Sequence, residues 1–123
     1  MKTKFIGIYL IFLFVTITAY WIITLSAKAY PEGPVEITFH VISELLMAAI
    51  CLIGGVLLLL KHAMGFKLSI AGLSMIIYSL LNAAGYFGER GDWIMAAIFI
   101  SLLLITSIAL AVQVFRLNHL RKK

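Results

Sequence analysis

Four long apolar stretches, separated only by short polar links, are the feature of this sequence that most constrains its fold. They cover residues 5–26, 37–60, 68–88 and 93–115. A helix needs about 20 apolar residues to cross the hydrocarbon core of a bilayer. Backbone groups in lipid must be paired within their own segment, so each stretch is expected to be a helix. The sequence therefore predicts an all-α integral membrane four-helix bundle, with residues 1–123 forming a single domain.

Composition excludes most other classes of protein. With 63% hydrophobic and 12% charged residues, the chain has too little polar surface for a soluble domain. The single cysteine, Cys51, excludes a disulfide scaffold. We interpret the net charge of +5 as a topology signal, not as a nucleic-acid surface. The lipid bilayer is thus the expected partner, and no nucleic acid is expected.

The distribution of charge predicts the orientation. Short links predict that consecutive helices are antiparallel neighbours. Eight of the ten basic residues lie on one side of the predicted membrane, namely Lys2, Lys4, Lys61, Lys67, Arg116, Arg121, Lys122 and Lys123. Only Lys28 and Arg90 lie on the other side. Cytoplasmic loops are enriched in basic residues, so both termini are expected in the cytoplasm, with the protein in the plasma membrane.

The first span has an alternative interpretation as a cleaved signal peptide. Lys2 and Lys4 precede its apolar run, and the run ends in Ala27-Lys28-Ala29, which is similar to a signal-peptidase site. The run is longer than the roughly 7 to 15 residues of a typical signal sequence. We therefore expect the first helix to stay in the protein.

The second span carries ionisable residues at a spacing of four: Glu36, His40 and Glu44. Residues four apart lie on one face of a helix. Counted from Glu36 at the outer boundary, His40 lies about 6 Å and Glu44 about 12 Å inside the membrane. An ionisable side chain at that depth costs about 2.5 to 3.5 kcal/mol, so it is expected to turn toward protein.

The third span offers partners at matching depth. Antiparallel registration is expected to bring Tyr78 near Glu44, Asn82 near His40, and Tyr86 near Glu36. The predicted ligand-binding or proton-coupling residues are Glu36, His40, Glu44, Tyr78, Asn82, Tyr86, Tyr20 and Ser101. From Leu45 to Leu60, the second span carries no polar side chain other than the thiol of Cys51. The sequence thus predicts a polar pocket in the outer half of the bundle, above an apolar plug.

Two interpretations of this constellation stay open. In the first, a protonated Glu44 and a neutral His40 only hold helices together, at about 0.6 kcal/mol per contact. In the second, the two residues form a functional pair that exchanges a proton. A metal site is not predicted, because ligands on three consecutive turns span about 12 Å. No two facing helices carry a pair of mid-membrane histidines, which argues against a b-type haem. No cofactor is expected.

The segment Phe39-His40-Val41-Ile42-Ser43-Glu44 contains a His-x-x-x-Glu pair that resembles the pair of the sterol isomerase and sigma-2 receptor group, whose common domain has four spans. This resemblance covers five residues and implies an isomerase-like enzyme. Size and span number also resemble those of small multidrug transporters and fluoride channels. Multidrug transporters of that kind have an acidic residue in the first helix, whereas the acid here lies in the second.

Two functions from different classes follow, and the sequence leaves open whether the chain is an enzyme. In the first, a small polytopic protein acts as a binding, transport or accessory module, and its pocket takes a small polar, cationic or amphiphilic ligand. In the second, a membrane enzyme uses His40 and Glu44 as an acid–base pair on an amphiphilic substrate. Four helices barely enclose a site, so a homo-oligomer or a larger membrane complex is expected under either function.

Overall fold

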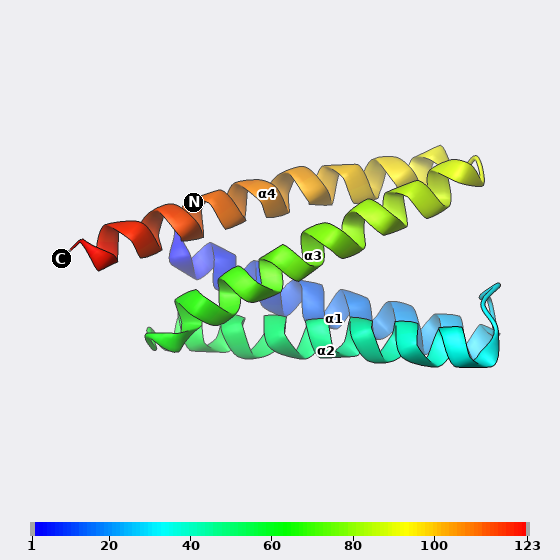
Figure 1. Cartoon of the computed structure of the whole chain (residues 1–123), viewed down its shortest axis with the longest axis horizontal. Helices are drawn as coiled ribbons and strands as arrows, with labels where there is room; N and C mark the ends of the chain where they lie inside the picture. Colours follow the sequence, from blue (N-terminus) through cyan, green and yellow to red (C-terminus); the bar gives the residue numbers. More distant parts are fainter. Residues whose placement is uncertain (1, 123) are drawn as a thin grey trace.

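The computed structural model describes residues 2–122 and contains four α-helices (Figure 1). These are α1 (Thr3–Ala27), α2 (Pro34–Leu59), α3 (Met64–Glu89) and α4 (Trp93–Arg121). All four are long and apolar enough to cross a membrane, which confirms the all-α class and the number of long apolar helices. Lys123, which was counted among the basic residues, lies outside the described residues, as does Met1.

The helix ends follow from local sequence. Lys28 ends α1 in the left-handed conformation, with a φ of 52°. Pro34 begins α2, where its fixed φ suits the first turn and its missing N–H has no partner to lose. Asp92 caps α4 by accepting a hydrogen bond from the Met95 N–H at 3.2 Å. Gly91 supplies the positive φ, 75°, of the preceding turn.

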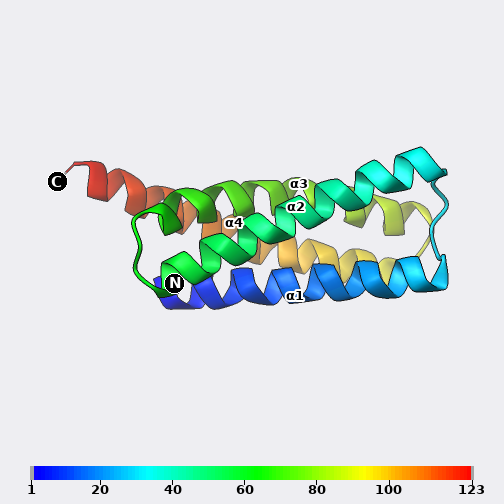
Figure 2. The same cartoon turned by 90° about the horizontal axis from the view of Figure 1, so that it is seen from below.

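Figure 1 shows both termini at the same end of the molecule as the α2–α3 connection, residues 60–63. We call this end the terminal side. The distal side is the opposite end, with the α1–α2 connection, residues 28–33, and the α3–α4 connection, residues 90–92. Helix α3 runs diagonally between the α1/α2 pair and α4, and both views show α4 extending past the start of α1 (Figures 1 and 2). The main helix contacts are α1 with α2, α2 with α3, and α3 with α4.

Glycines set the closest approaches between helices. A Cβ atom added to Gly55 of α2 would lie only 2.7 Å from the carbonyl oxygen of Gly7 in α1. A Cβ atom on Gly65 would lie 2.7 Å from the backbone nitrogen of Leu58. Real side chains do not approach backbone this closely, so the observed packing of α2 against both neighbours requires glycine at these positions.

The apolar core includes Ile6, Leu10, Cys51, Leu73 and Ile76 of α1, α2 and α3. Helix α4 adds the buried Ala109 and covers the core with partly buried side chains, namely Phe99, Leu102, Leu103, Leu110 and Val112. The remainder of α4 is largely apolar and exposed, as expected for a surface that faces acyl chains. The chain thus buries one core and leaves wide apolar faces that suit a lipid bilayer.

Candidate functional site

A cluster of ionisable side chains lies on the distal side, around His40 of α2. The Nδ1 atom of His40 lies 3.3 Å from Oε1 of Glu32, which belongs to the α1–α2 connection. Its Nε2 atom lies 3.9 Å from Oε1 of Glu44, one helical turn further along α2. The two carboxylates therefore bracket the imidazole, one at each ring nitrogen. We call Glu32, His40 and Glu44 the acid–imidazole cluster.

Neighbouring helices hold this cluster in place. Ser79 of α3 donates a hydrogen bond to Oε1 of Glu44 at 2.8 Å. The ring of Trp21 in α1 packs edge-on against the His40 ring, with 4.9 Å between the ring centroids. The side chains of Glu32 and Glu44 are 15% and 17% exposed, whereas that of His40 is 43% exposed. The carboxylates are thus largely enclosed, and the imidazole stays accessible.

Aromatic side chains surround the cluster. The ring of Tyr20 packs edge-on against Trp21, with a centroid distance of 5.3 Å. The guanidinium of Arg90 lies 3.6 Å from the centroid of the Tyr86 ring. Aromatic faces next to carboxylates favour a positively charged occupant.

The number of protons on the His40 imidazole determines which interactions the cluster makes. Nδ1 of His40 lies within hydrogen-bond distance of the Glu32 carboxylate. Nε2 lies 3.9 Å from the Glu44 carboxylate, which is too far for a hydrogen bond, so this contact is an ion pair only when the imidazole carries both protons. Within residues 2–122, the second oxygen of Glu32, Oε2, is buried and has no hydrogen-bond partner. The arrangement thus suits a bound proton or a small cation between the carboxylates.

Four of the other predicted residues, Glu36, Ser101, Tyr78 and Asn82, lie apart from this cluster. Glu36 is exposed in the first turn of α2. Ser101 is exposed and donates to the Ala97 carbonyl of its own helix at 2.9 Å. Tyr78 is 72% exposed and Asn82 is also exposed, both on the outer face of α3. Tyr20, as described above, lies beside the cluster.

The expected registration of α3 was therefore wrong by one residue. Ser79, and not Tyr78, contacts Glu44. Each residue advances a helix by about 100°, so a shift of one position turns a whole stripe away from the neighbouring helix. Asn82, four residues after Tyr78, turns outward with it.

Sequence reasoning missed Glu32 and Trp21 as members of this site. Glu32 lies in a connection whose path follows no helical period, and it is brought back to His40 because Pro34 begins α2 just after it. The small hydroxyl of Ser79 within a span favours a helix interface, but the sequence did not pair it with Glu44.

The expected apolar plug is also wrong, because polar side chains are buried on the terminal side. Gln113 of α4 donates to Ser69 of α3 at 2.8 Å, and both residues are fully buried. The hydroxyls of Tyr9 in α1 and Thr106 in α4 lie 2.7 Å apart. Polar groups in an apolar interior need partners, and these side chains find them on other helices. The expected plug rested on the sequence of α2 alone, and α2 is apolar on the terminal side.

The same network reaches the end of the bundle. Arg116 of α4 donates to the Thr3 hydroxyl at 2.7 Å and to Oε1 of Gln113 at 3.5 Å. These bonds connect α1 with α4, although the two helices have few backbone contacts. We call Thr3, Tyr9, Ser69, Thr106, Gln113 and Arg116 the terminal network.

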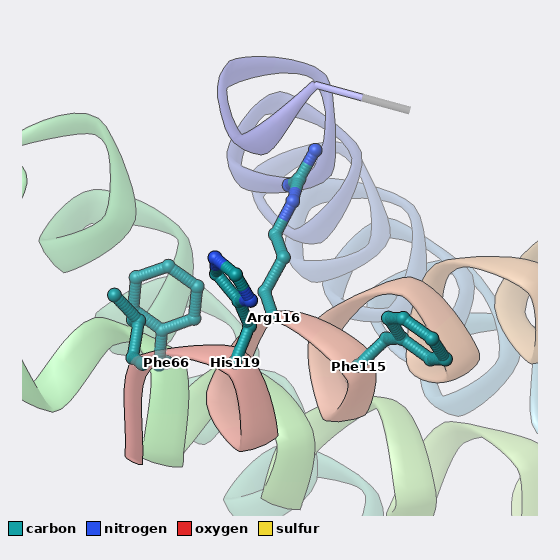
Figure 3. A pocket seen from close by; sticks show the side chains of 5 residues that line it. Phe66, Phe115, Arg116 and His119 are labelled. Atoms are coloured by element: carbon teal, nitrogen blue, oxygen red, sulfur yellow. The ribbon is translucent and has the colours of Figure 1, made fainter. Parts of the chain in front are cut away.

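An open cavity of about 290 Å³ lies beside the terminal network (Figure 3). It is lined by Phe66, Phe115, Arg116, His119 and Leu120, and in Figure 3 the Arg116 side chain points toward α1. Its lining is apolar apart from Arg116 and His119, so it lacks the paired carboxylates of the distal cluster.

A metal centre has little support in this geometry. Over residues 2–122, no group of three or more His, Cys, Asp or Glu side chains is arranged to hold a metal ion. Glu36 contributes nothing to the cluster, so the carboxylates beside His40 are Glu32 and Glu44.

Fold and composition together define the class of protein: a small all-α protein with four helices that suit a lipid bilayer. The chain belongs to a family described as a domain of unknown function, DUF8058, whose model matches residues 1–123. No curated protein and no solved structure matches the chain.

Proposed function

We propose that this protein is a non-enzymatic membrane module that binds a small organic cation on its distal side and releases a proton as it does so. One observation carries the proposal: His40 lies between the carboxylates of Glu32 and Glu44, with one ring nitrogen directed at each. A cation and the second imidazole proton therefore compete for the same two carboxylates.

Charge and surroundings explain the preference for a cation. With a neutral His40 and both carboxylates ionised, the cluster carries two negative charges in a partly enclosed site. Coulomb attraction is stronger in such a site than in water. Trp21 and Tyr20 add aromatic surfaces, which attract organic cations by about 0.5 to 2 kcal/mol. A protonated His40 places a positive charge in the same space and opposes binding.

We also infer that consecutive helices are antiparallel neighbours and that both termini are cytoplasmic. This inference rests on the eight-to-two distribution of basic residues. It places the acid–imidazole cluster on the outer face of the plasma membrane. Protease digestion of a tag fused after residue 123 tests the orientation, because a cytoplasmic tag is protected in sealed, right-side-out cells.

Fluorescence of Trp21 provides the test of binding. The chain has two tryptophans, so Trp93→Phe leaves Trp21, beside His40, as the only one. We expect a saturable change in Trp21 fluorescence when tetramethylammonium is added to this variant in lipid nanodiscs. Glu44→Gln is expected to weaken binding about tenfold, equivalent to about 1.4 kcal/mol. Glu89→Gln, which removes an acid on the same side but outside the cluster, is expected to leave affinity unchanged.

The alternatives make different predictions for the same variants. An enzyme using His40 and Glu44 as an acid–base pair loses turnover of an amphiphilic substrate in Glu44→Gln and keeps its affinity. If the cluster only holds helices together, Glu44→Gln changes stability and no saturable fluorescence change is seen in any variant. Either result contradicts the proposed cation site.

A further inference from the structure

The exposed face of α3 is its most polar one. One exposed row consists of Lys67, Ala71, Ser74, Tyr78, Asn82, Gly85 and Glu89, which recur every three or four residues; the exposed Met75 and Leu81 lie beside it. The opposite face, with Ser69, Leu73 and Ile76, is buried against α2 and α4. In contrast, the exposed residues of α4 include Ile98, Ile100 and Leu104. We call the exposed row on α3 the polar stripe.

Two side chains of the polar stripe lie deep in the predicted span. Asn82 and Tyr78 precede the end of α3 at Glu89 by seven and eleven residues, which corresponds to about 10 Å and about 16 Å along the helix. Among residues 2–122, neither side chain has a hydrogen-bond partner. Ser74 differs, because it donates to the Ile70 carbonyl of its own helix at 2.7 Å.

An unpartnered amide and phenol are unfavourable in hydrocarbon, because lipid tails offer no hydrogen bonds. Long side chains near a helix end reach the interface, but Asn82 is short and Tyr78 lies near the middle of the span. Another protein surface is thus expected to cover the stripe. That surface must offer both donors and acceptors at the same depth.

We propose that the polar stripe is an interface between two copies of this chain, with α3 packed against α3 about a two-fold axis along the membrane normal. Copies inserted in the same orientation place identical residues at equal depth. The Asn82 amide and the Tyr78 hydroxyl each donate and accept, so each is complementary to its own copy. A row made only of basic or only of acidic side chains would not be complementary to its own copy.

The geometry at Gly85 supports close approach along this face. A Cβ atom added to Gly85 would meet nothing within 4 Å, so the backbone there is open to a neighbouring helix. Small residues at helix interfaces in membranes allow such contact. The charged ends of the stripe, Lys67 and Glu89, lie at the membrane surfaces, where water and ions screen repulsion between like charges. Two-fold pairs are also the commonest oligomers.

Disulfide crosslinking in membranes tests the interface. The natural Cys51 is buried, so the unmodified chain is the control for background crosslinking. Under copper phenanthroline, Asn82→Cys is expected to form covalent dimers about tenfold faster than Ile100→Cys. Ile100 of α4 is the matched control, because it is exposed and lies seven residues from Trp93, as Asn82 does from Glu89. Equal rates, or faster crosslinking at Ile100, overturn the proposal.

A second measurement does not depend on cysteine chemistry. Asn82→Leu makes the stripe more compatible with lipid and is expected to leave the helix content unchanged by circular dichroism. Single-molecule photobleaching in liposomes is expected to show a dimer dissociation constant raised about 3- to 20-fold, the effect of losing about 0.6 to 1.7 kcal/mol of hydrogen bonding. An unchanged dimer population overturns the interface. If the Asn82→Cys variant crosslinks to a different protein and the purified chain is monomeric, the partner is not a second copy of this chain, and the proposal is overturned.

Discussion

The terminal and distal sides of this molecule use similar polar residues in opposite ways. On the terminal side, Gln113 and Thr106 are buried and bonded to other helices. On the distal side, His40 is accessible although it lies between two largely enclosed carboxylates. A polar residue in a span therefore does not by itself indicate function. Burial and the direction of the bonds distinguish residues that join helices from residues that meet a ligand.

Glycine contacts add to this difference. Gly7, Gly55 and Gly65 bring helices together on the terminal side, where an added Cβ atom would meet backbone. Gly85, near the distal end of α3, meets nothing within 4 Å. We therefore expect substitutions to affect stability mainly on the terminal side and ligand binding mainly on the distal side.

The largest expected effect on stability is that of Gly55→Ala. The new Cβ atom would lie 2.7 Å from the Gly7 carbonyl oxygen, so α1 and α2 must separate. Overpacking of this kind costs about 1 to 3 kcal/mol. Steric-trapping measurements of unfolding free energy in detergent provide the test, with Gly85→Ala as the control. Equal stability of the two variants would show that glycine contacts do not hold the terminal side together.

A somewhat smaller loss is expected for Gln113→Leu. This change keeps the side-chain volume similar but removes the bonds to Ser69 and Arg116, so destabilisation of about 1 to 2 kcal/mol is expected. Ser107→Ala in the same helix is the matched control. Ser107 is exposed and bonds only the Leu103 carbonyl of α4, so its replacement should change stability by less than about 0.5 kcal/mol.

Tyr9→Phe removes the single hydroxyl that joins α1 to Thr106 of α4. Interhelical hydrogen bonds in membranes average about 0.6 kcal/mol, and we expect a loss of that size. The distal counterpart is Tyr20→Phe, at a residue that is 40% exposed, and a smaller change is expected there. The same unfolding assay compares the two. A larger effect at Tyr20 would remove the distinction between the two sides.

The smallest change in stability is expected for Glu44→Gln, although it should weaken cation binding about tenfold. The Gln side chain keeps an oxygen that accepts from Ser79, so the contact between α2 and α3 persists. We expect the unfolding free energy to change by less than about 0.5 kcal/mol. A loss comparable to that of Gln113→Leu would indicate that the acid–imidazole cluster acts mainly in packing.

Sequence alone predicted four long apolar helices and placed His40 and Glu44 on one face of the second. These predictions depend on local features, namely hydrophobic length and a spacing of four. The rotation of α3 depends on packing against α2, and an error of one residue exchanged Tyr78 for Ser79. Helix α4 is apolar almost all round, so its sequence did not reveal that Thr106 and Gln113 face inward. Glu32 lies in a connection between two helices, and no helical periodicity predicts the position of its side chain.

Calorimetry of tetramethylammonium binding tests the central claim most directly, because it counts protons exchanged. The heat of binding is measured at about pH 6, where imidazoles change charge, in two buffers of different ionisation enthalpy. We predict that the heat depends on the buffer in the unmodified protein, which indicates proton release, and that this dependence is lost in His40→Gln. Binding heat that is identical in both buffers for the unmodified protein would contradict the account.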